Sequence, residues 1–264
     1  MTALNPRQHQ IMTLARQLGT VQVDDLAGRF DVTPQTIRRD LNDLCDGRML
    51  ARTHGGAMLS SGVENVAYEA RRLLAAREKQ VIGQRAASLI PNNCSLLINI
   101  GTTTEEVARA LVHHEGLLVI TNNLHVASIL LPCPKIDVIV AGGVLRRSDG
   151  GIVGEAAVDF IGQFKVDHAV MGVSAIDDDG AMLDFDYREV RAAQAILNNA
   201  RNVILVSDAM KFSRTAPVRL GHLSQIDIFV TDQPPPEKIA DICRNGGVQL
   251  EIADIETPRS ANDP

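Results

Sequence analysis

The stretch TPQTIRRDLNDL, residues 33–44, gives the clearest structural signal in the sequence. Thr33 suits a helix N-cap because its hydroxyl can accept a hydrogen bond from an unpaired backbone N–H group. Pro34 suits the first helical position, where no N–H donor is needed. An apolar stripe at helical spacing follows, made of Ile37, Leu41 and Leu44. The pattern predicts a helix that starts sharply and packs on one side.

The opposite side of this helix carries side chains that suit contact with DNA. They are Gln35, Arg39 and Asn42, with Thr36 and Arg38 on the flanks of the stripe. Amide, hydroxyl and guanidinium groups bond to base edges or phosphates, and the arginine fork matches O6 and N7 of guanine. The solvated face of an ordinary helix has a similar composition, so the helix alone leaves both interpretations open.

The residues before this helix indicate a helix-turn-helix unit. Residues 7–18 have apolar positions at helical spacing and end at Gly19, a common C-cap residue. Residues 24–30 predict a second, short helix whose two initial aspartates suit the positive end of the helix dipole. Only residues 31–33 separate the second helix from the third, and such a short turn is typical of helix-turn-helix units.

The residues after the helix indicate a wing. Two short strands around Gly55 and Gly56 would bring Arg52 and His54 to the phosphate backbone or the minor groove of DNA. Three helices and a wing make a winged helix over residues 1–58, with a small helical protein-interaction module as the alternative. The residues expected to contact DNA are Thr33, Gln35, Thr36, Arg38, Arg39, Asn42, Arg52 and His54.

The charge of the chain is distributed unevenly. With 264 residues, 45% of them hydrophobic, the chain is long enough for two domains and a sizeable core. Its formal net charge of -6 at first argues against a nucleic-acid partner. Up to Met58, however, seven arginines and six aspartates give a net charge of +1, and the remainder carries -7. Any DNA affinity therefore depends on where a few arginines point.

The sequence also lacks the marks of several other classes of protein. Its four cysteines are widely and irregularly spaced, with no Cys-x-x-Cys pair and no nearby histidine pattern, so we expect no metal and no cofactor. The first ten residues do not resemble a signal peptide, and no apolar run approaches membrane length. We therefore expect a cytoplasmic protein with reduced thiols and no membrane partner.

A second domain of α/β type is expected after a polar linker. Small polar residues at 59–62 mark the boundary, and we interpret residues 59–77 as a linker and connecting helix. One helix is expected to run from residue 64 to Ile90 and to end at Pro91. The remainder, residues 78–264, forms the second domain.

Apolar runs and helical runs alternate along this second domain from residue 95 onward. The alternation is the pattern of βαβ units on a mostly parallel sheet, which binds ligands at the carboxyl ends of its strands. The expected strands are 96–100, 117–120, 136–140, 169–173, 203–206, 226–230 and 248–252. The expected helices are 104–111, 124–131, 155–164, 187–199 and 237–244.

Polar motifs follow these expected strands. The motif GTTT, residues 101–104, opens a helix directly after a strand. Glycine lets a ligand approach the backbone, and N–H groups and hydroxyls at a helix start suit a phosphate, although a plain N-cap is the alternative. The motifs at 121–123 and 142–143 follow neighbouring strands and add weight to the phosphate interpretation.

A further motif, SDAMKF at 207–212, supplies opposite charges after another strand. Asp208 can bond to sugar hydroxyls and Lys211 can meet a phosphate, with a surface salt bridge as the alternative. Glu155 and the segment 184–188 could line a pocket or an interface. Helix capping and a solvated loop explain them equally well.

The segment VDDLAGRFDVTPQTIRRDLNDLCDGRMLARTHGGA, residues 23–57, resembles the signature of the DeoR family of bacterial sugar-catabolism repressors, and the resemblance continues through almost the whole chain. It implies a winged helix whose Gln35, Thr36, Arg38 and Arg39 face the operator. It also implies a sensor domain with a sugar-phosphate isomerase-like, Rossmann-like fold. The segments 146–164 and 183–191 are most similar to family members that respond to sn-glycerol 3-phosphate.

The chain departs from the family pattern at two places. The family usually carries Asp where this chain has Asn99, and the loop FSRTAP at 212–217 has no clear counterpart. Asn99 keeps hydrogen bonding but lacks the charge that proton transfer would require. The residues expected to bind the effector are Asn99, Gly101, Thr102, Thr103, Thr104, Thr121, Asn122, Asn123, Gly142, Gly143, Glu155, Asp208 and Lys211.

The leading hypothesis is a transcriptional repressor of a sugar or polyol regulon. It would bind double-stranded operator DNA as a homo-oligomer, dimer or tetramer, and release it when a phosphorylated effector binds, with glycerol 3-phosphate favoured. One alternative is a regulator of the same type that responds to another sugar phosphate. The other is a sugar-phosphate isomerase with an accessory DNA-binding module, using Asp208 or Glu155 as base and Lys211 as electrostatic partner.

Overall fold

The computed structural model describes residues 5–18, 20–46, 49–53, 55–59 and 68–253. The chain divides into two compact units, Met1–Ala75 and Ala76–Pro264, which are described separately. Within the described residues, no helix is long and apolar enough to cross a membrane.

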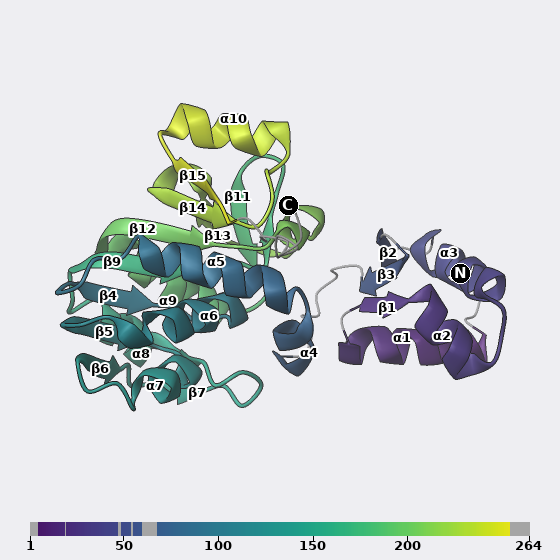
Figure 1. Cartoon of the computed structure of the whole chain (residues 1–264), viewed down its shortest axis with the longest axis horizontal. Coiled ribbons are helices and arrows are strands. Elements are labelled where there is room, and N and C mark those ends of the chain that lie inside the picture. Colours follow the sequence, from purple (N-terminus) through teal and green to yellow (C-terminus); the bar gives the residue numbers. More distant parts are fainter. Residues whose placement is uncertain (1–4, 19, 47–48, 54, 60–67, 254–264) are drawn as a thin grey trace, which may run out of the picture. The chain divides into compact units, whose positions relative to one another are not determined.

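The first unit is a winged helix (Figure 1). Its three strands form an antiparallel sheet in the order β1-β3-β2, so the hairpin that follows the third helix pairs back onto the strand that precedes the second. One apolar cluster joins the helices and the sheet. The elements are α1 (Pro6–Leu18), β1 (Thr20–Gln22), α2 (Val23–Phe30), α3 (Pro34–Asp46), β2 (Leu50–Thr53), β3 (Gly56–Leu59) and α4 (Tyr68–Leu73).

Helix α3 begins and packs as its sequence predicts. The Thr33 hydroxyl accepts a hydrogen bond from the N–H of Thr36 at 3.3 Å, which confirms the N-cap. Asp31, in the left-handed region at φ 50°, ends α2 and lets the chain turn tightly into α3. The predicted apolar stripe is fully buried, and it consists of Ile37, Leu41 and Leu44.

The prediction of one helix ending at Ile90 is wrong. Residues 64–67 lie outside the described part, and the remainder forms two helices, α4 and α5 (Ala76–Ser88), separated at Leu74 and Ala75. Ala75 adopts the left-handed conformation at φ 50°, which stops a right-handed helix. Alanine has a high helix propensity, so no local signal announces this break.

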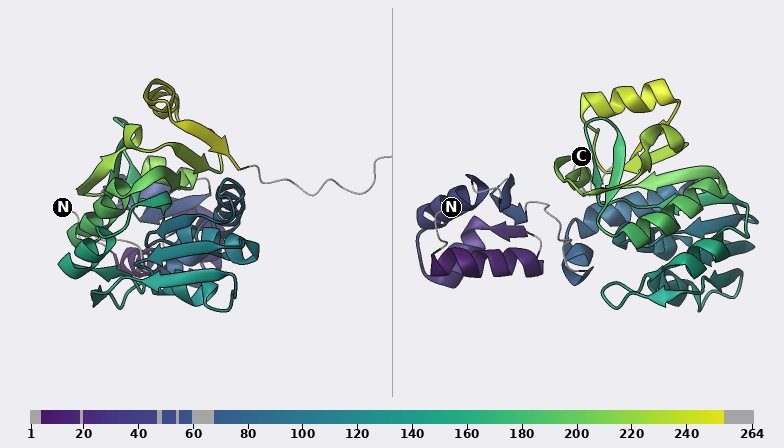
Figure 2. Two further views of the ribbon diagram at one scale, coloured as in Figure 1. Left: turned by 90° about the vertical axis from the view of Figure 1, so that its left-hand side faces the viewer. Right: turned by 180° about the vertical axis from the view of Figure 1, so that it is seen from behind.

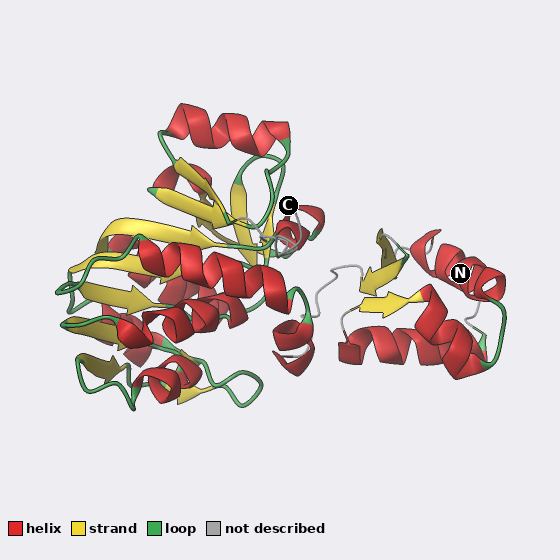
Figure 3. Cartoon of the chain, viewed as in Figure 1, coloured by secondary structure: helices red, strands yellow, loops and turns green. Residues whose placement is uncertain are grey.

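The second unit is built on a seven-stranded, wholly parallel sheet in the order β15-β14-β12-β9-β4-β5-β6 (Figure 3). Strand succession reverses direction between β4 and β9, the point at which such sheets bind ligands. The predicted alternation of strands and helices is confirmed. The strands are β4 (Ser95–Ile98), β5 (Leu117–Thr121), β6 (Ile136–Val140), β9 (Val166–Met171), β12 (Ala200–Val206), β14 (Ile228–Thr231) and β15 (Gln249–Ile252).

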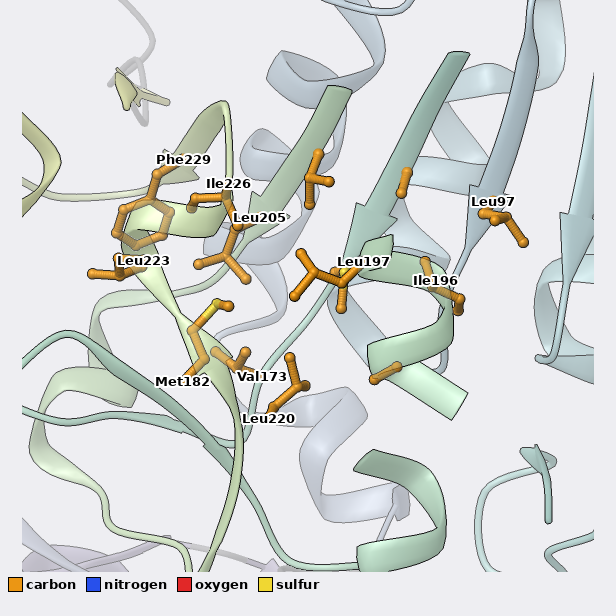
Figure 4. Close-up of a cluster of buried hydrophobic side chains, with 14 of the residues drawn as sticks. Leu97, Val173, Met182, Ile196, Leu197, Leu205, Leu220, Leu223, Ile226 and Phe229 are labelled. Carbon is orange, nitrogen blue, oxygen red and sulfur yellow. The ribbon is translucent and has the colours of Figure 1, made fainter. Parts of the chain in front are cut away.

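Helices cover both faces of this sheet (Figure 2). Two apolar clusters, one on each face, hold the layers together. Helices α5, α6 (Thr102–Ala110) and α7 (Leu124–Leu130) contribute to one cluster. Helices α8 (Glu155–Ile161), α9 (Tyr187–Asn198) and α10 (Glu237–Gly246) contribute to the other, where Ile196 and Leu197 lie near Leu205 and Leu220 (Figure 4).

Two small β structures lie outside the predicted alternation. One is an antiparallel sheet in the order β10-β11-β13, and the other is the hairpin β7-β8. Their strands have two to five residues, too few for a period to show in the sequence. The additional elements are β7 (Val144–Leu145), β8 (Ile152–Val153), β10 (Ala175–Ile176), β11 (Ala181–Asp184), β13 (Val218–His222) and the 3-10 helices η1 (Leu111–His113), η2 (Ala209–Ser213) and η3 (Leu223–Gln225).

Gly83 tests the close packing of α5 on α6. A Cβ atom at this position would lie 2.6 Å from the carbonyl carbon of Glu106 and 2.7 Å from its oxygen, and backbone cannot move aside cheaply. We expect Gly83→Ala to lower the free energy of unfolding by about 1–3 kcal/mol, measured by urea denaturation followed by circular dichroism.

Gly28→Ala is the matched control. Gly28 is an exposed helical glycine with no atom within 4 Å of the added Cβ, so this substitution should stabilise its helix by roughly 0.5–1 kcal/mol. Equal unfolding energies for Gly83→Ala and the unmodified protein would contradict the tight α5–α6 contact.

Candidate functional sites

The polar side of α3 is exposed and continuous. Gln35, Arg38, Arg39 and Asn42 are all exposed, while Thr36 is half-buried. Their spacing of three and four residues places them on one side of the helix, opposite the buried stripe. The structure therefore brings the predicted DNA-contacting residues of α3 together.

The wing is attached to this helix by a direct contact. Arg52 of β2 is exposed, and its Nη2 donates a hydrogen bond to the backbone oxygen of Arg38 at 3.3 Å. Thr33 is committed to capping, since its hydroxyl also lies 2.9 Å from the hydroxyl of Thr36. His54 lies outside the described residues.

A buried carboxylate that the sequence reasoning missed orients α3 on α1. Asp40 is 4% exposed, and its Oδ2 lies 2.5 Å from Nε of Arg7. Asn5 Nδ2 donates to the other carboxylate oxygen at 3.3 Å. Arg7 thus serves the fold, which leaves fewer arginines of the first unit for DNA. The sequence gives little sign of this role of Asp40, because its partners Arg7 and Asn5 are 33 and 35 residues away.

The carboxyl ends of the central strands meet at one edge of the sheet. Ile98, the last residue of β4, pairs with Thr121 of β5 and Val170 of β9. The N–H of Asn99 donates to Val170 O at 3.0 Å, and the N–H of Ala141 donates to Thr121 O at 2.9 Å. The motifs that follow these strands therefore lie side by side.

The GTTT motif forms a turn and the first turn of α6. Gly101 has φ 155° and precedes the helix, so the first N–H groups of α6 lack helical partners. The Thr104 hydroxyl lies 2.8 Å from both Asn99 O and Gly101 O and is used within the turn. The side chains of Thr102 and Thr103 are buried in the first turn of α6, where their hydroxyls are candidate donors to a ligand.

Several buried polar atoms at this edge have no hydrogen-bond partner among the described residues. Asn122 donates to Ile152 O at 3.2 Å, and Asn123 Oδ1 caps α7 by accepting from the N–H of His125 at 2.9 Å, so each amide is fixed at one end. The other end is unsatisfied, which is costly for a buried group unless a ligand or water binds there. The unpartnered atoms are Asn99 Oδ1, Asn122 Oδ1, Asn123 Nδ2 and Thr231 Oγ1.

Two carboxylates lie beyond the next strands. Asp208 is buried and caps η2 by accepting from the N–H of Met210 at 3.2 Å. Asp232, which the sequence reasoning missed, accepts from the N–H of Ala209 at 2.8 Å. Burial and then the charges of Asp208 and Glu78 raise the pKa of Asp232. The strand-end rule that pointed to Asp208 applies equally to Asp232, which follows β14.

The remaining predicted residues are placed differently. Lys211 is half-buried in η2, close to Asp208 in sequence. A Cβ added at Gly142 would have no atom within 4 Å. A Cβ added at Gly143 would lie 2.9 Å from Cγ2 of Ile152, so Gly143 allows close packing. Glu155 is exposed and lies 3.7 Å from Arg191, apart from the buried polar group.

A half-buried arginine joins three carboxylates beside this edge. Arg146, between β7 and β8, donates to both oxygens of Asp149 at 2.8 and 2.6 Å, to Asp186 at 3.1 Å and to Glu189 at 2.6 Å. Burial alone would lower the pKa of Arg146, but the pairs with Asp149 and Glu189 outweigh it and raise the pKa. We call these four side chains the Arg146 cluster. An Arg and Asp three residues apart in RRSDGG was its only local signal.

The Arg146 cluster supports the strand-end residues directly. Asp149 Oδ1 accepts from the N–H of Gly151 at 3.3 Å, and Gly151 bridges to Asn123. The N–H of Ile152 donates to Asn122 O at 2.7 Å. The hairpin loop therefore positions both asparagines that present unsatisfied groups.

Both units match models of one protein family. Residues 7–62 match the DeoR-like helix-turn-helix domain, and residues 74–233 match the DeoR C terminal sensor domain. The chain belongs to the DeoR family. Its winged helix and its parallel α/β unit are thus the DNA-binding and sensor domains of a DeoR-family regulator.

Curated relatives agree over nearly the whole DeoR-family chain. The chain is 45% identical to the glycerol-3-phosphate regulon repressor of Escherichia coli over 93% of its length and 98% of that protein. It is 47% identical to the repressor of the same name from Haemophilus influenzae, over 87% of this chain and 89% of that one. Identity to the E. coli repressor CsqR is 38%, over 93% and 94% of the two chains.

Among solved structures, ribose 5-phosphate isomerase A of Neisseria gonorrhoeae superposes on 51% of this chain and 52% of its own, with a TM-score of 0.37 and 12% identity. So low a score carries no argument about activity.

In the described part of the chain, no three His, Cys, Asp or Glu side chains gather in a way that could hold a metal ion.

Replacing Arg146 tests the cluster. Arg146→Met leaves three crowded carboxylates without their cation, and we expect it to lower the free energy of unfolding at pH 7 by about 3–5 kcal/mol. Hydrogen bonds from Arg188 and Arg146 outweigh burial and lower the pKa of Asp186, so its contribution is present above the unfolded-state pKa and lost as pH falls through the folded one.

The difference between variant and unmodified protein should therefore be constant near pH 7 and shrink as pH falls from about 5 towards 3, where Asp186 takes up its proton in the variant before it does in the unmodified protein. Urea denaturation across this range measures it. Arg188→Met, at a largely exposed side chain, should change stability by less than about 0.5 kcal/mol at any pH. A pH-independent penalty for Arg146→Met would contradict the electrostatic account.

Proposed function

We propose that this DeoR-family chain is a DNA-binding transcriptional repressor of a glycerol-type polyol regulon, released by sn-glycerol 3-phosphate. The observation that carries the proposal is the 45% identity, over 93% of the chain, to a repressor named for the glycerol-3-phosphate regulon. A repressor that binds operator DNA would act in the cytoplasm. The second candidate is a regulator of the same kind that responds to another sugar phosphate. Its only support is Asn99, which stands where the family usually carries Asp.

The chemistry of the strand-end site supports a small phosphorylated polyol. A phosphate suits the free N–H groups at the start of α6, with the hydroxyls of Thr102 and Thr103 as further donors. Lys211 would add a charge-assisted contact. Hydroxyls of the polyol can donate to and accept from the buried amides of Asn99 and Asn122, which otherwise remain unsatisfied.

Repression and release then follow from linkage. A ligand shifts an equilibrium only by its difference in affinity for the two states. The effector would favour a conformation in which paired winged helices no longer match the spacing of the operator half-sites. The protein therefore acts as a homo-oligomer, since one short recognition helix with little net charge secures an operator poorly.

Catalysis is not part of the proposal. Asp208 already caps η2, and Glu155 lies on the surface beside Arg191. Asn99 offers an amide where an acid or base would be needed for proton transfer. Of the described residues at the strand ends, Asn99, Asp208 and Glu155 therefore do not supply a well-placed general base.

The function is tested by titrating the full chain against its own upstream and neighbouring promoters in gel-shift assays, with and without glycerol 3-phosphate and a panel of sugar phosphates. We expect glycerol 3-phosphate to release the DNA. Release by fructose 1-phosphate alone would keep the family function and overturn the effector. Turnover of a phosphosugar by the purified protein would support an enzyme instead.

Lys211→Met tests in the same assay whether Lys211 contacts the phosphate of the effector. Loss of a charge-assisted contact to phosphate costs about 1.5–3 kcal/mol, so half-release should need at least tenfold more effector while effector-free DNA affinity stays unchanged. Lys238→Met, which removes an exposed lysine paired with Asp178, is the control. Identical effector responses of both variants would remove Lys211 from the site.

Arg39→Ala tests base reading by α3. If Arg39 contacts a base, its loss should cost about 1–3 kcal/mol of operator binding and relax the sequence preference. Competition titrations with operator variants and random DNA measure both effects, with Arg244→Ala in α10 as the control. Uniform weakening on every sequence would instead mark Arg39 as a phosphate contact.

A further inference from the structure

Asp232 is a buried carboxylate that forms no ion pair with any described lysine, arginine or histidine. It follows β14 and is 7% exposed. The charged groups that act on it are two further acids, Asp208 after β12 and Glu78 in the first turn of α5. Burial raises the pKa of Asp232, and repulsion from these acids adds to the rise, although hydrogen bonds from backbone N–H groups oppose it. A carboxylate in such surroundings is costly, so the hydrogen bonds that it accepts have to offset that cost.

The carboxylate of Asp232 holds the first turn of η2. Its Oδ1 accepts the N–H of Ala209, the first residue of η2, at 2.8 Å. Asp208 accepts the next N–H, that of Met210, at 3.2 Å. The first N–H groups of a helix have no partner within it, and here two carboxylates that follow neighbouring strands satisfy two successive donors. The start of η2 is therefore tied to β14 as well as to β12, which it follows.

Helix η2 depends on such tertiary contacts for its position. It has only five residues, and a 3-10 helix of that length has little stability of its own. Beyond the Asp232 contact, the ring of Phe212 packs edge-on against Phe229 of β14, with centroids 6.1 Å apart. The N–H of Lys211 donates to the backbone oxygen of Asp208 at 3.1 Å. Whatever fixes the start of η2 therefore fixes the place of Lys211 as well.

Asp232 itself lies too far from the expected phosphate position to contact a small effector. The strand order places β14 three strands from β4, and β4 leads into α6, whose first N–H groups suit a phosphate. Neighbouring strands are about 4.8 Å apart, so the ends of β4 and β14 are separated by about 14 Å. A three-carbon phosphate ester is shorter than that. Asp232 can therefore influence such a ligand only through η2.

We propose that Asp232 is a positioning residue of the effector site: its carboxylate fixes the start of η2 and so places Lys211, without contacting the effector. The inference rests on the proposed function, because it takes the effector to carry a phosphate that meets Lys211. The site uses the bond to the N–H of Ala209 and not the negative charge, since one more negative charge opposes an anionic ligand. An uncharged acceptor oxygen at this position would hold η2 equally well.

Substitutions at Asp232 separate the hydrogen bond from the charge. Asp232→Ala removes both, and the full chain should then need at least tenfold more glycerol 3-phosphate for half-release from operator DNA, measured by gel shift at equal starting occupancy. Asp232→Asn keeps an oxygen that can accept from the N–H of Ala209, so it should need no more effector than the unmodified protein. A tenfold rise for Asp232→Asn as well would show that the charge is required and would overturn the proposal.

Asp227→Ala is the matched control. Asp227 Oδ2 accepts the N–H of Val203 at 2.7 Å, so it also joins β14 to β12, but at the amino end of β14. Both alanine substitutions remove a carboxylate that binds a backbone N–H group and should lower the free energy of unfolding. Only Asp232→Ala should change the amount of effector needed, and an equal rise for both variants would mean general destabilisation and contradict the proposal.

Ala209→Pro removes the donor in place of the acceptor, which keeps the test decisive if Asp232→Ala does not fold. Proline suits the first position of a helix, and Asp208 before it has φ -74° and ψ 155°, a conformation that a following proline accepts. The variant should also need at least tenfold more effector. Combining it with Asp232→Ala should add no further rise, because both changes break the same bond.

The same titrations separate failure of this inference from failure of the proposed function. If no phosphate of the panel releases the unmodified protein, the proposed function fails and the positioning role of Asp232 fails with it. If glycerol 3-phosphate releases the unmodified protein, Asp232→Ala and Ala209→Pro at equal concentrations, only the positioning role fails.

Discussion

The Arg146 side chain, which is 16% exposed, connects the parts of the sensor unit that the proposed function needs. A buried charge is tolerated only when it is paired and its hydrogen bonds are satisfied, and Arg146 meets this condition with Asp149, Asp186 and Glu189. One of these carboxylates belongs to the hairpin loop and two to the start of α9. The cluster therefore gives the loop a fixed place beside the sheet.

The parallel sheet gathers the residues of the strand-end site next to this fixed loop. Because all seven strands point the same way, the residues after β4, β5, β9 and β12 gather at one edge. Asn122 and Asn123 use one end of each amide for the fold and leave the other unsatisfied. Such fixed, unpaired groups lose little entropy on binding, so they favour a small polar ligand that satisfies them.

The winged helix follows a different physical logic. It has little net charge, and one of its arginines, Arg7, pairs with buried Asp40 to orient α3. The operator recognition that we propose therefore depends on a few exposed side chains, among them Arg38 and Arg39, and on more than one copy binding at once.

The sequence by itself determined the helices of the winged helix, the strands of the parallel sheet and the strand-end motifs, because apolar periodicity, the Thr33 cap and the order of strand and helix are properties of neighbouring residues. The tertiary structure alone decided the partners of Arg146, 40 and 43 residues away, the burial of Asp232 and the exposed position of Glu155. It also decided the helix break at Ala75. These features depend on which distant segments meet and on what that contact buries, and local sequence carries no record of either.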